Sequence, residues 1–152
     1  MTAAAFAVFS FVLLSGGCAS VDQSEALIKQ VETMDLDYLL GDHQRARSIL
    51  TEEIALLENS RVVQPRRQAA ALFMACGRLC VLEKRLGASV ASELAFVKVR
   101  YWNLRRYELA GEITEQALAE YMSLTPERLT EIIDRADKAI NHGRGPKYIE
   151  VR

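Results

Sequence analysis

Two cysteines, Cys76 and Cys80, stand one helical turn apart and would place two thiols on the same face of a helix. Such a pair could ligate a metal ion or act in redox chemistry, but a metal site would need further ligands. The chain's two histidines, His43 and His142, lie far away along the sequence. A disulfide across one helical turn is also geometrically awkward. We therefore expect two small buried side chains at a close helix contact, with no metal site and no cofactor.

Motifs of catalytic sites do not occur in the chain. The sequence contains no Gly-x-Ser-x-Gly, no His-Glu-x-x-His and no glycine-rich phosphate-binding loop. On amphipathic helices, neighbouring carboxylates usually form a solvated face. We therefore predict no catalytic residue and a protein that is not an enzyme. The carboxylate pairs interpreted in this way are Glu52/Glu53, Glu112/Glu115 and Glu131/Asp134.

A tryptophan flanked by cations forms the candidate binding face. Lys98, Trp102 and Arg105 follow one another at helical spacing and share a face, and Arg106 lies beside them. An aromatic ring with cations around it could stack on a sugar or receive a carboxylate-bearing peptide. The alternative is a buried tryptophan that packs against the next helix while its cations reach out to solvent.

The first residues resemble an export signal with a lipid-attachment site. Residues 3–14 are apolar except for Ser10, which is too short a run to span a membrane comfortably but has the length of a signal-peptide core. The segment Leu14-Ser15-Gly16-Gly17-Cys18 then resembles a lipobox, the recognition site of bacterial lipoprotein signal peptides. The resemblance implies that Cys18 becomes the acylated N-terminus of a protein anchored in the bacterial cell envelope.

Two features of this segment depart from the lipoprotein pattern. Leu14 lies four residues before Cys18, and Ser15 takes the place where lipoboxes usually carry leucine. No lysine or arginine precedes Lys29, whereas signal peptides carry a basic N-terminal region. An ordinary cleaved signal peptide, an uncleaved anchor and a buried helix of a cytosolic protein are the alternatives.

Helical periodicity dominates the rest of the chain, and no stretch alternates as a strand would. We predict an all-α fold of antiparallel hairpins, either a superhelix or a small bundle of about six helices. The signal region would cover residues 1–18, the helical domain 19–141, and a flexible tail 142–152. The predicted helices are 22–40, 43–58, 66–85, 88–109, 112–123 and 126 to about 141.

Capping residues set several of these boundaries. Gly41 ends the first helix and Asp42 is a good N-cap for the second. Pro65 marks the start of the third helix. Thr125 and Pro126 form the N-cap and first position of the last helix.

Three helices carry apolar patterns that predict their packing. The centre of the third, residues 69–76, is apolar on every face, which is typical of a helix packed on several sides. The fourth has an apolar stripe at 4-3-4-3 spacing, formed by Val90, Leu94, Val97, Tyr101 and Leu104. The fifth is expected to face inward with Ile113, Ala117, Leu118, Tyr121 and Met122.

One hairpin resembles a tetratricopeptide repeat. The stretch Gly41-Asp42-His43-Gln44-Arg45-Ala46, followed by Leu50, is similar to the central part of that motif, with a tight turn and a small residue at a close helix contact. A second, weaker match uses Cys76, Leu79, Cys80, Gly87, Ser92 and Phe96. The two turn glycines are further apart than the repeat period of about 34 residues. The resemblance implies a groove that binds protein or peptide, and an unrelated helical bundle is the alternative.

The net charge of −1 conceals three blocks of different sign. Residues 19–60 carry nine acidic and three basic side chains, residues 61–106 two acidic and ten basic, and residues 107–152 nine acidic and six basic. A basic block can bind an acidic partner, or neighbouring helices can neutralise it. No nucleic-acid-binding motif accompanies it, so we do not expect nucleic acid as a partner.

These features together predict a cell-envelope lipoprotein with a non-enzymatic helical interaction or scaffold module. Its expected partners are an envelope protein or peptide, and the membrane through the lipid anchor at Cys18. The alternative function is a small-ligand or glycan-binding bundle that uses the face around Trp102.

Overall fold

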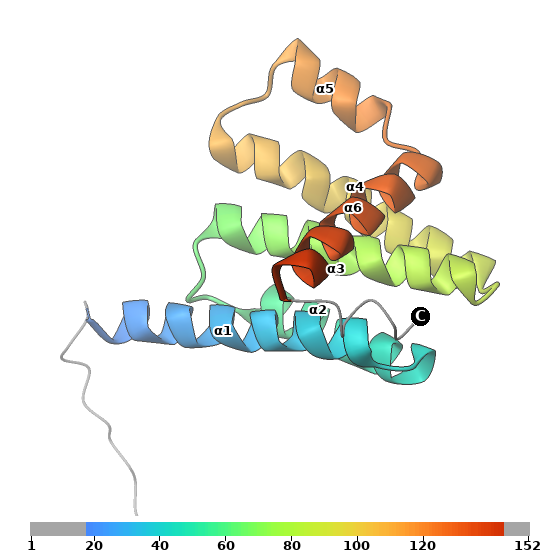
Figure 1. Ribbon diagram of the computed structural model, residues 1–152. Coiled ribbons are helices and arrows are strands. Elements are labelled where there is room, and N and C mark those ends of the chain that lie inside the picture. The colour runs from blue at the N-terminus through green and yellow to red at the C-terminus, as the bar shows by residue number, and fades with distance from the viewer. Residues whose placement is uncertain (1–17, 145–152) are drawn as a thin grey trace, which may run out of the picture.

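Six α-helices make up the part of the chain that the computed structural model describes, which is residues 18–144, with side chains described from 23 to 140 (Figure 1). No strand occurs within those residues, so the all-α prediction is confirmed. Residues 1–17 of the expected signal region, the side chain of Cys18 and residues 145–152 of the expected tail lie outside this description. The helices are α1 (Cys18–Leu40), α2 (His43–Asn59), α3 (Pro65–Arg85), α4 (Ser89–Ala110), α5 (Glu115–Met122) and α6 (Pro126–Arg144).

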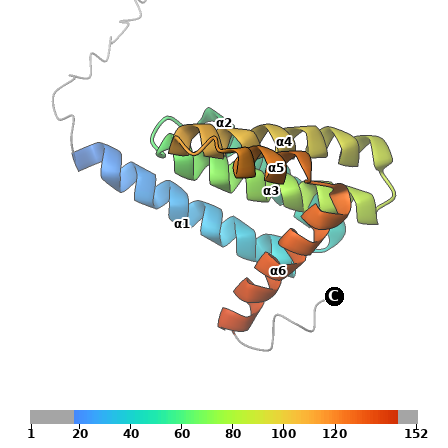
Figure 2. The same cartoon turned by 90° about the horizontal axis from the view of Figure 1, so that it is seen from above.

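Helix α3 lies at the centre of the arrangement. Helices α1 to α4 follow one another as antiparallel neighbours, so α2 packs on one side of α3 and α4 on another. Helix α5 contacts α4, and α6 then crosses back over α3 towards the C-terminal part of α1 (Figure 2). The result is a small helical bundle in which three helices surround α3.

The surroundings of α3 explain its apolar sequence. Leu72, Phe73, Cys76 and Val81 are all buried, as predicted for a helix packed on several sides. On the side that faces α6, a Cβ atom added to Gly77 would lie 2.7 Å from Cδ1 of Ile133. The missing side chain at Gly77 therefore lets α6 approach α3 closely.

Local chemistry fixes the turns much as the sequence predicts. The Asp42 carboxylate accepts a hydrogen bond from the Arg45 amide at 2.8 Å and caps α2. The Thr125 hydroxyl accepts one from the Arg128 amide at 3.2 Å at the start of α6. Helix α5 begins later than predicted because Gly111 turns the chain into the left-handed region, with φ of 67°, and Thr114 provides the N-cap.

Four of the five residues of the predicted apolar stripe of α4 lie on the outside of the bundle, and the fifth, Leu104, is half-buried. Val90, Leu94, Val97 and Tyr101 are 69, 66, 66 and 57% exposed. The fully buried residues of α4 are instead smaller or polar, with Phe96 and Trp102 partly buried beside them, and the Ser92 hydroxyl donates to the Cys80 carbonyl at 3.0 Å. Small residues let two helices approach closely, which is why they occupy the contact. These buried residues of α4 are Ser92, Ala95, Val99 and Asn103.

Helix α5 also departs from the prediction. It was expected to face inward with five residues, but Ile113, Leu118 and Met122 are exposed and Ala117 is its buried residue. The helix is short and its principal contact is with α4. Beside Ala117, polar and aromatic groups make that contact: the Tyr107 hydroxyl donates to Glu120 at 2.6 Å, and the Arg100 guanidinium lies over the ring of the half-buried Tyr121.

Candidate functional site

An arginine in the interior joins three helices. Arg78, on α3, has a side chain only 2% exposed, and its Nε lies 3.0 Å from Oδ1 of Asp137 on α6. A second ion pair joins its Nη1 to Asp35 on α1. The Tyr38 hydroxyl donates to the other oxygen of Asp137 at 3.5 Å, and the guanidinium lies over the Tyr38 ring. One cation thus holds α1, α3 and α6 together.

Glu53 adds a third carboxyl group to this interior cluster. Its side chain is on α2, the residue is 1% exposed, and its Oε2 has no hydrogen-bond partner within the described residues. Burial raises the pKa of Glu53 to about 8, helped by the nearby Asp35 and opposed by Arg78. The prediction that Glu52 and Glu53 form a solvated face is therefore wrong for Glu53, while Glu52 is exposed.

A hollow of about 490 Å³ opens beside these charges. It lies between α1, α2, α3 and α6, and Asp35, Glu53 and Arg78 supply its charged groups. The remainder of its wall is apolar. The hollow exists because several of these wall residues are alanines, whose side chains are too small to fill it. The apolar lining consists of Val31, Ala70, Ala71, Met74, Ala136, Ala139 and Ile140.

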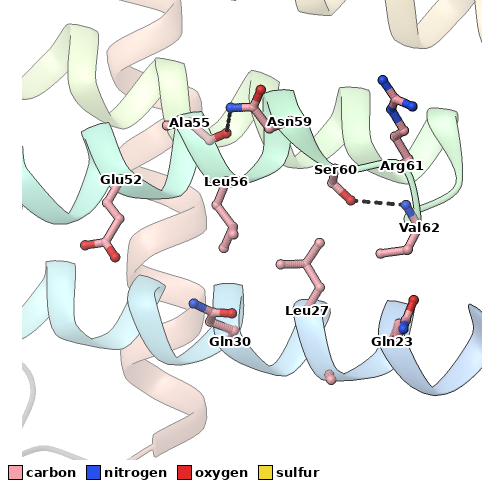
Figure 3. Close-up of a pocket in the computed structure, with 11 residues that line it drawn as sticks. Gln23, Leu27, Gln30, Glu52, Ala55, Leu56, Asn59, Ser60, Arg61 and Val62 are labelled. Atoms are coloured by element: carbon pink, nitrogen blue, oxygen red, sulfur yellow. Dashed lines mark hydrogen bonds between the residues drawn. The ribbon is translucent and has the colours of Figure 1, made fainter. Parts of the chain in front are cut away.

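A wider depression separates the N-terminal half of α1 from the C-terminal part of α2 (Figure 3). Its volume is about 740 Å³, and Leu27 and Leu56 face it from the two helices. The polar groups at its edge bond locally: the Asn59 amide donates to the Ala55 carbonyl at 2.8 Å. The depression therefore lacks the converging polar groups of a catalytic or ligand-binding site, and we interpret it as a gap between two loosely packed helices.

The four residues of the predicted basic face take separate partners. Lys98 pairs with Glu58 of α2 at 2.9 Å, and Arg105 pairs with Glu108 of its own helix at 2.8 Å. The Arg106 guanidinium lies over the rings of Phe73 and Tyr107. Trp102 is half-buried against the core and meets the edge of the Tyr101 ring, with centroids 4.8 Å apart. A sugar or carboxylate site around Trp102 stays a prediction.

The two helical cysteines are free thiols in the interior. Burial raises the pKa of the Cys76 thiol to about 12, and burial also raises that of Cys80, whose sulfur lies 3.5 Å from the Ser92 hydroxyl. Thiolate formation at neutral pH is thereby suppressed. Within the described residues, no group of three or more histidine, cysteine or acidic side chains is arranged to hold a metal ion.

Sequence reasoning missed the interior cluster, although a signal for it was present. Arg78 is the single charged residue between Gln68 and Leu82, in a stretch that is otherwise strongly apolar. A cation in the centre of a buried helix requires anionic partners from elsewhere in the fold. The sequence does not identify those partners, because Asp35 and Asp137 are remote from Arg78 along the chain.

Comparison with known proteins adds no identification. No protein-family model matches the chain, and neither the curated proteins nor the solved structures contain a significant match to it. Among the residues that the structure describes, no helix combines the length and the apolar character needed to cross a bilayer.

Proposed function

We propose that the protein is a non-enzymatic helical interaction module of the bacterial cell envelope that docks an acidic amphipathic helix of a partner protein. The observation that carries this proposal is the exposed stripe Val90, Leu94, Val97 and Tyr101, which we call the α4 stripe. Isolated exposed apolar residues are common, but a row of large ones along one helix face is typical of an interaction surface.

The spacing of the α4 stripe favours a helix as the partner. Steps of four, three and four residues are the a/d pattern of a heptad repeat, in which side chains of one helix fit between those of another. A partner helix would need apolar residues at the same spacing. The Leu94 side chain also lines a groove of about 390 Å³ between α2 and α4, which would extend the contact.

Charge beside the α4 stripe favours an acidic partner. Lys98 and Arg105 flank it, and about half of each side chain remains exposed despite their ion pairs. They belong to the block of residues 61–106 in which basic side chains greatly outnumber acidic ones. Glutamates at the edges of the partner helix would be attracted to these cations, which gives specificity and faster association.

The docking proposal is tested with a designed peptide of about three heptads that carries leucine at a and d and glutamate at e and g. Trp102 is the only tryptophan and touches Tyr101, so its fluorescence reports binding. We expect micromolar affinity, reduced about tenfold or more by Leu94→Asp, because burying a leucine contributes about 1.5–3 kcal/mol.

Two controls distinguish this specific contact from non-specific hydrophobic association. Gln44→Asp makes the same charge change at an exposed position of α2 and should leave the affinity unchanged. A peptide with lysine at e and g should bind at least about tenfold more weakly. Equal binding of both peptides, or no effect of Leu94→Asp, would contradict the proposal. Concentration-dependent dimers that Leu94→Asp abolishes would show instead that the occupant is a second copy of the chain.

Anchoring through Cys18 is the second part of the proposed function. The lipobox-like segment supports it, and α1 begins at Cys18, so an acylated N-terminus would be joined directly to the helical domain. We expect Cys18→Ala to abolish palmitate incorporation and to release the protein from the membrane fraction of producing bacteria. Gln23→Ala, at an exposed position of α1, is the control and should change neither. Continued labelling of Cys18→Ala would overturn lipid attachment at this residue.

A further inference from the structure

We infer that the hollow between α1, α2, α3 and α6 is a binding site for a small primary alkylammonium ion, with Glu53 as the group that receives the ammonium. This site is separate from the α4 stripe and does not depend on the docking of a partner helix. No property of the sequence assigns a ligand to it.

The charge balance of the cluster favours a cationic ligand. Among the described residues, Arg78 is the cation of this cluster and forms ion pairs with Asp35 and Asp137, whereas Glu53 is a third carboxyl group that forms no ion pair and whose Oε2 accepts no hydrogen bond. A buried carboxylate oxygen without a hydrogen-bonding partner is costly, and the nearby Arg78 only partly offsets the effect of burial on Glu53. An ammonium group supplies both a positive charge and N–H donors for Oε2 of Glu53.

The rest of the wall favours an organic cation over a metal ion. Ala71, Met74 and Ala136 offer apolar contacts at which an alkyl chain could be buried. No set of three metal-ligating side chains is assembled here or elsewhere among the described residues. The volume of about 490 Å³ falls in the range of small-molecule pockets.

Ionisation of Glu53 should couple ligand binding to pH. Its raised pKa of about 8 means that the carboxyl group is mostly protonated at neutral pH. Among the described residues, the charged groups around it are Asp35 from α1, Arg78 from α3 and Asp137 from α6, with the Tyr38 hydroxyl next to Asp137. An ammonium ion binds the ionised form, so affinity should rise as the pH rises towards and past 8, while the amine itself stays charged up to about pH 10.

Calorimetric titration of the full chain with n-butylammonium chloride, at constant ionic strength, tests the inference. We expect binding about twentyfold tighter at about pH 8.5 than at about pH 6.5, following the ionised fraction of Glu53. Glu53→Gln should weaken binding at pH 8.5 at least about tenfold and remove the pH dependence, since it keeps the shape of the side chain without its charge. Glu52→Gln removes the same charge from the exposed neighbour and should bind like the parent.

A second variant keeps the test independent of how well Glu53→Gln folds. Ala136→Leu fills part of the hollow without changing any charge, and should weaken n-butylammonium at least about tenfold by steric exclusion. Neutral n-butanol should not compete. Absence of binding at millimolar concentration, unchanged affinity in both variants, or equal competition by K⁺ or Ca²⁺ would overturn the inference.

Discussion

Replacement of Arg78 by methionine is expected to lower the free energy of unfolding by about 3–5 kcal/mol, the usual cost of removing one member of a buried ion pair. Methionine keeps much of the volume and the helix propensity of arginine. It removes the guanidinium that pairs with Asp35 and Asp137 and lies near Glu53 in the interior. This loss would be a large fraction of the total stability, which is only about 5–15 kcal/mol for a domain of this size. Urea unfolding followed by circular dichroism at pH 7 measures it.

Arg85→Met is the matched control for this prediction. Arg85 lies on the same helix and forms an ion pair of 2.8 Å with Asp134, but its side chain is 46% exposed. Surface pairs of this kind contribute about 0–1 kcal/mol, so the control should lose little. If both variants were destabilised equally, the interior cluster would be no more important for stability than a surface pair.

Replacement of Gly77 by alanine is expected to destabilise the protein by about 1–3 kcal/mol, although alanine is the better helix former by about 1 kcal/mol. The added Cβ would lie 2.7 Å from Cδ1 and 3.3 Å from Cγ1 of Ile133, with Leu129 close by. Ile133 and Leu129 are fully buried, so neither side chain has free space into which it can move. Helix α6 would have to shift away from α3. Thermal and urea unfolding both measure the loss.

A double-mutant cycle with Ile133→Val tests this explanation. Valine lacks the Cδ1 atom that the new Cβ would meet, and by itself the change should cost about 0.5–1.5 kcal/mol. Combined with Gly77→Ala it should cost less than the sum of the two single changes, because the clash is relieved. Additive losses, or a Gly77→Ala variant more stable than the parent, would show that the helices do not meet as closely as described.

Local signals predicted much of this fold. Asp42 and Thr125 cap helices as expected, and the apolar centre of α3 is packed on several sides. Each of these depends on residues within a few positions of one another, so their side chains act on the adjacent backbone or on one helix face. Such features can be inferred from one sequence without knowledge of the tertiary arrangement.

The orientation of α4 could not be predicted in this way. Periodicity identified the stripe Val90, Leu94 and Val97, but spacing alone does not tell whether such a face packs on the core or lies outside. The buried positions of α4 are held by residues such as Ser92 and Ala95, because only small side chains fit where two helices approach closely. This exposed stripe is the surface on which the docking proposal is based.

The interior cluster could not be predicted from the sequence for a different reason. Glu53 has the same residue type as its exposed neighbour Glu52, and only the packing of four helices separates their environments. The pKa and the candidate role of Glu53 therefore come from residues on other helices. A single sequence does not show which residues of the other helices will surround Glu53.

The crossing of α6 over α3 has a consequence for the order of folding. The chain is synthesised from its N-terminus, so the early hairpins leave the ribosome before Ile133 and Asp137 exist. Until then the surface of α3 at Gly77 is uncovered, and Arg78 lacks its ion pair with Asp137. These contacts are of high sequence separation, which slows folding by raising the contact order. Helix α6 therefore joins an arrangement of earlier helices, and the closest contact at Gly77 and the ion pair between Arg78 and Asp137 form only when it does.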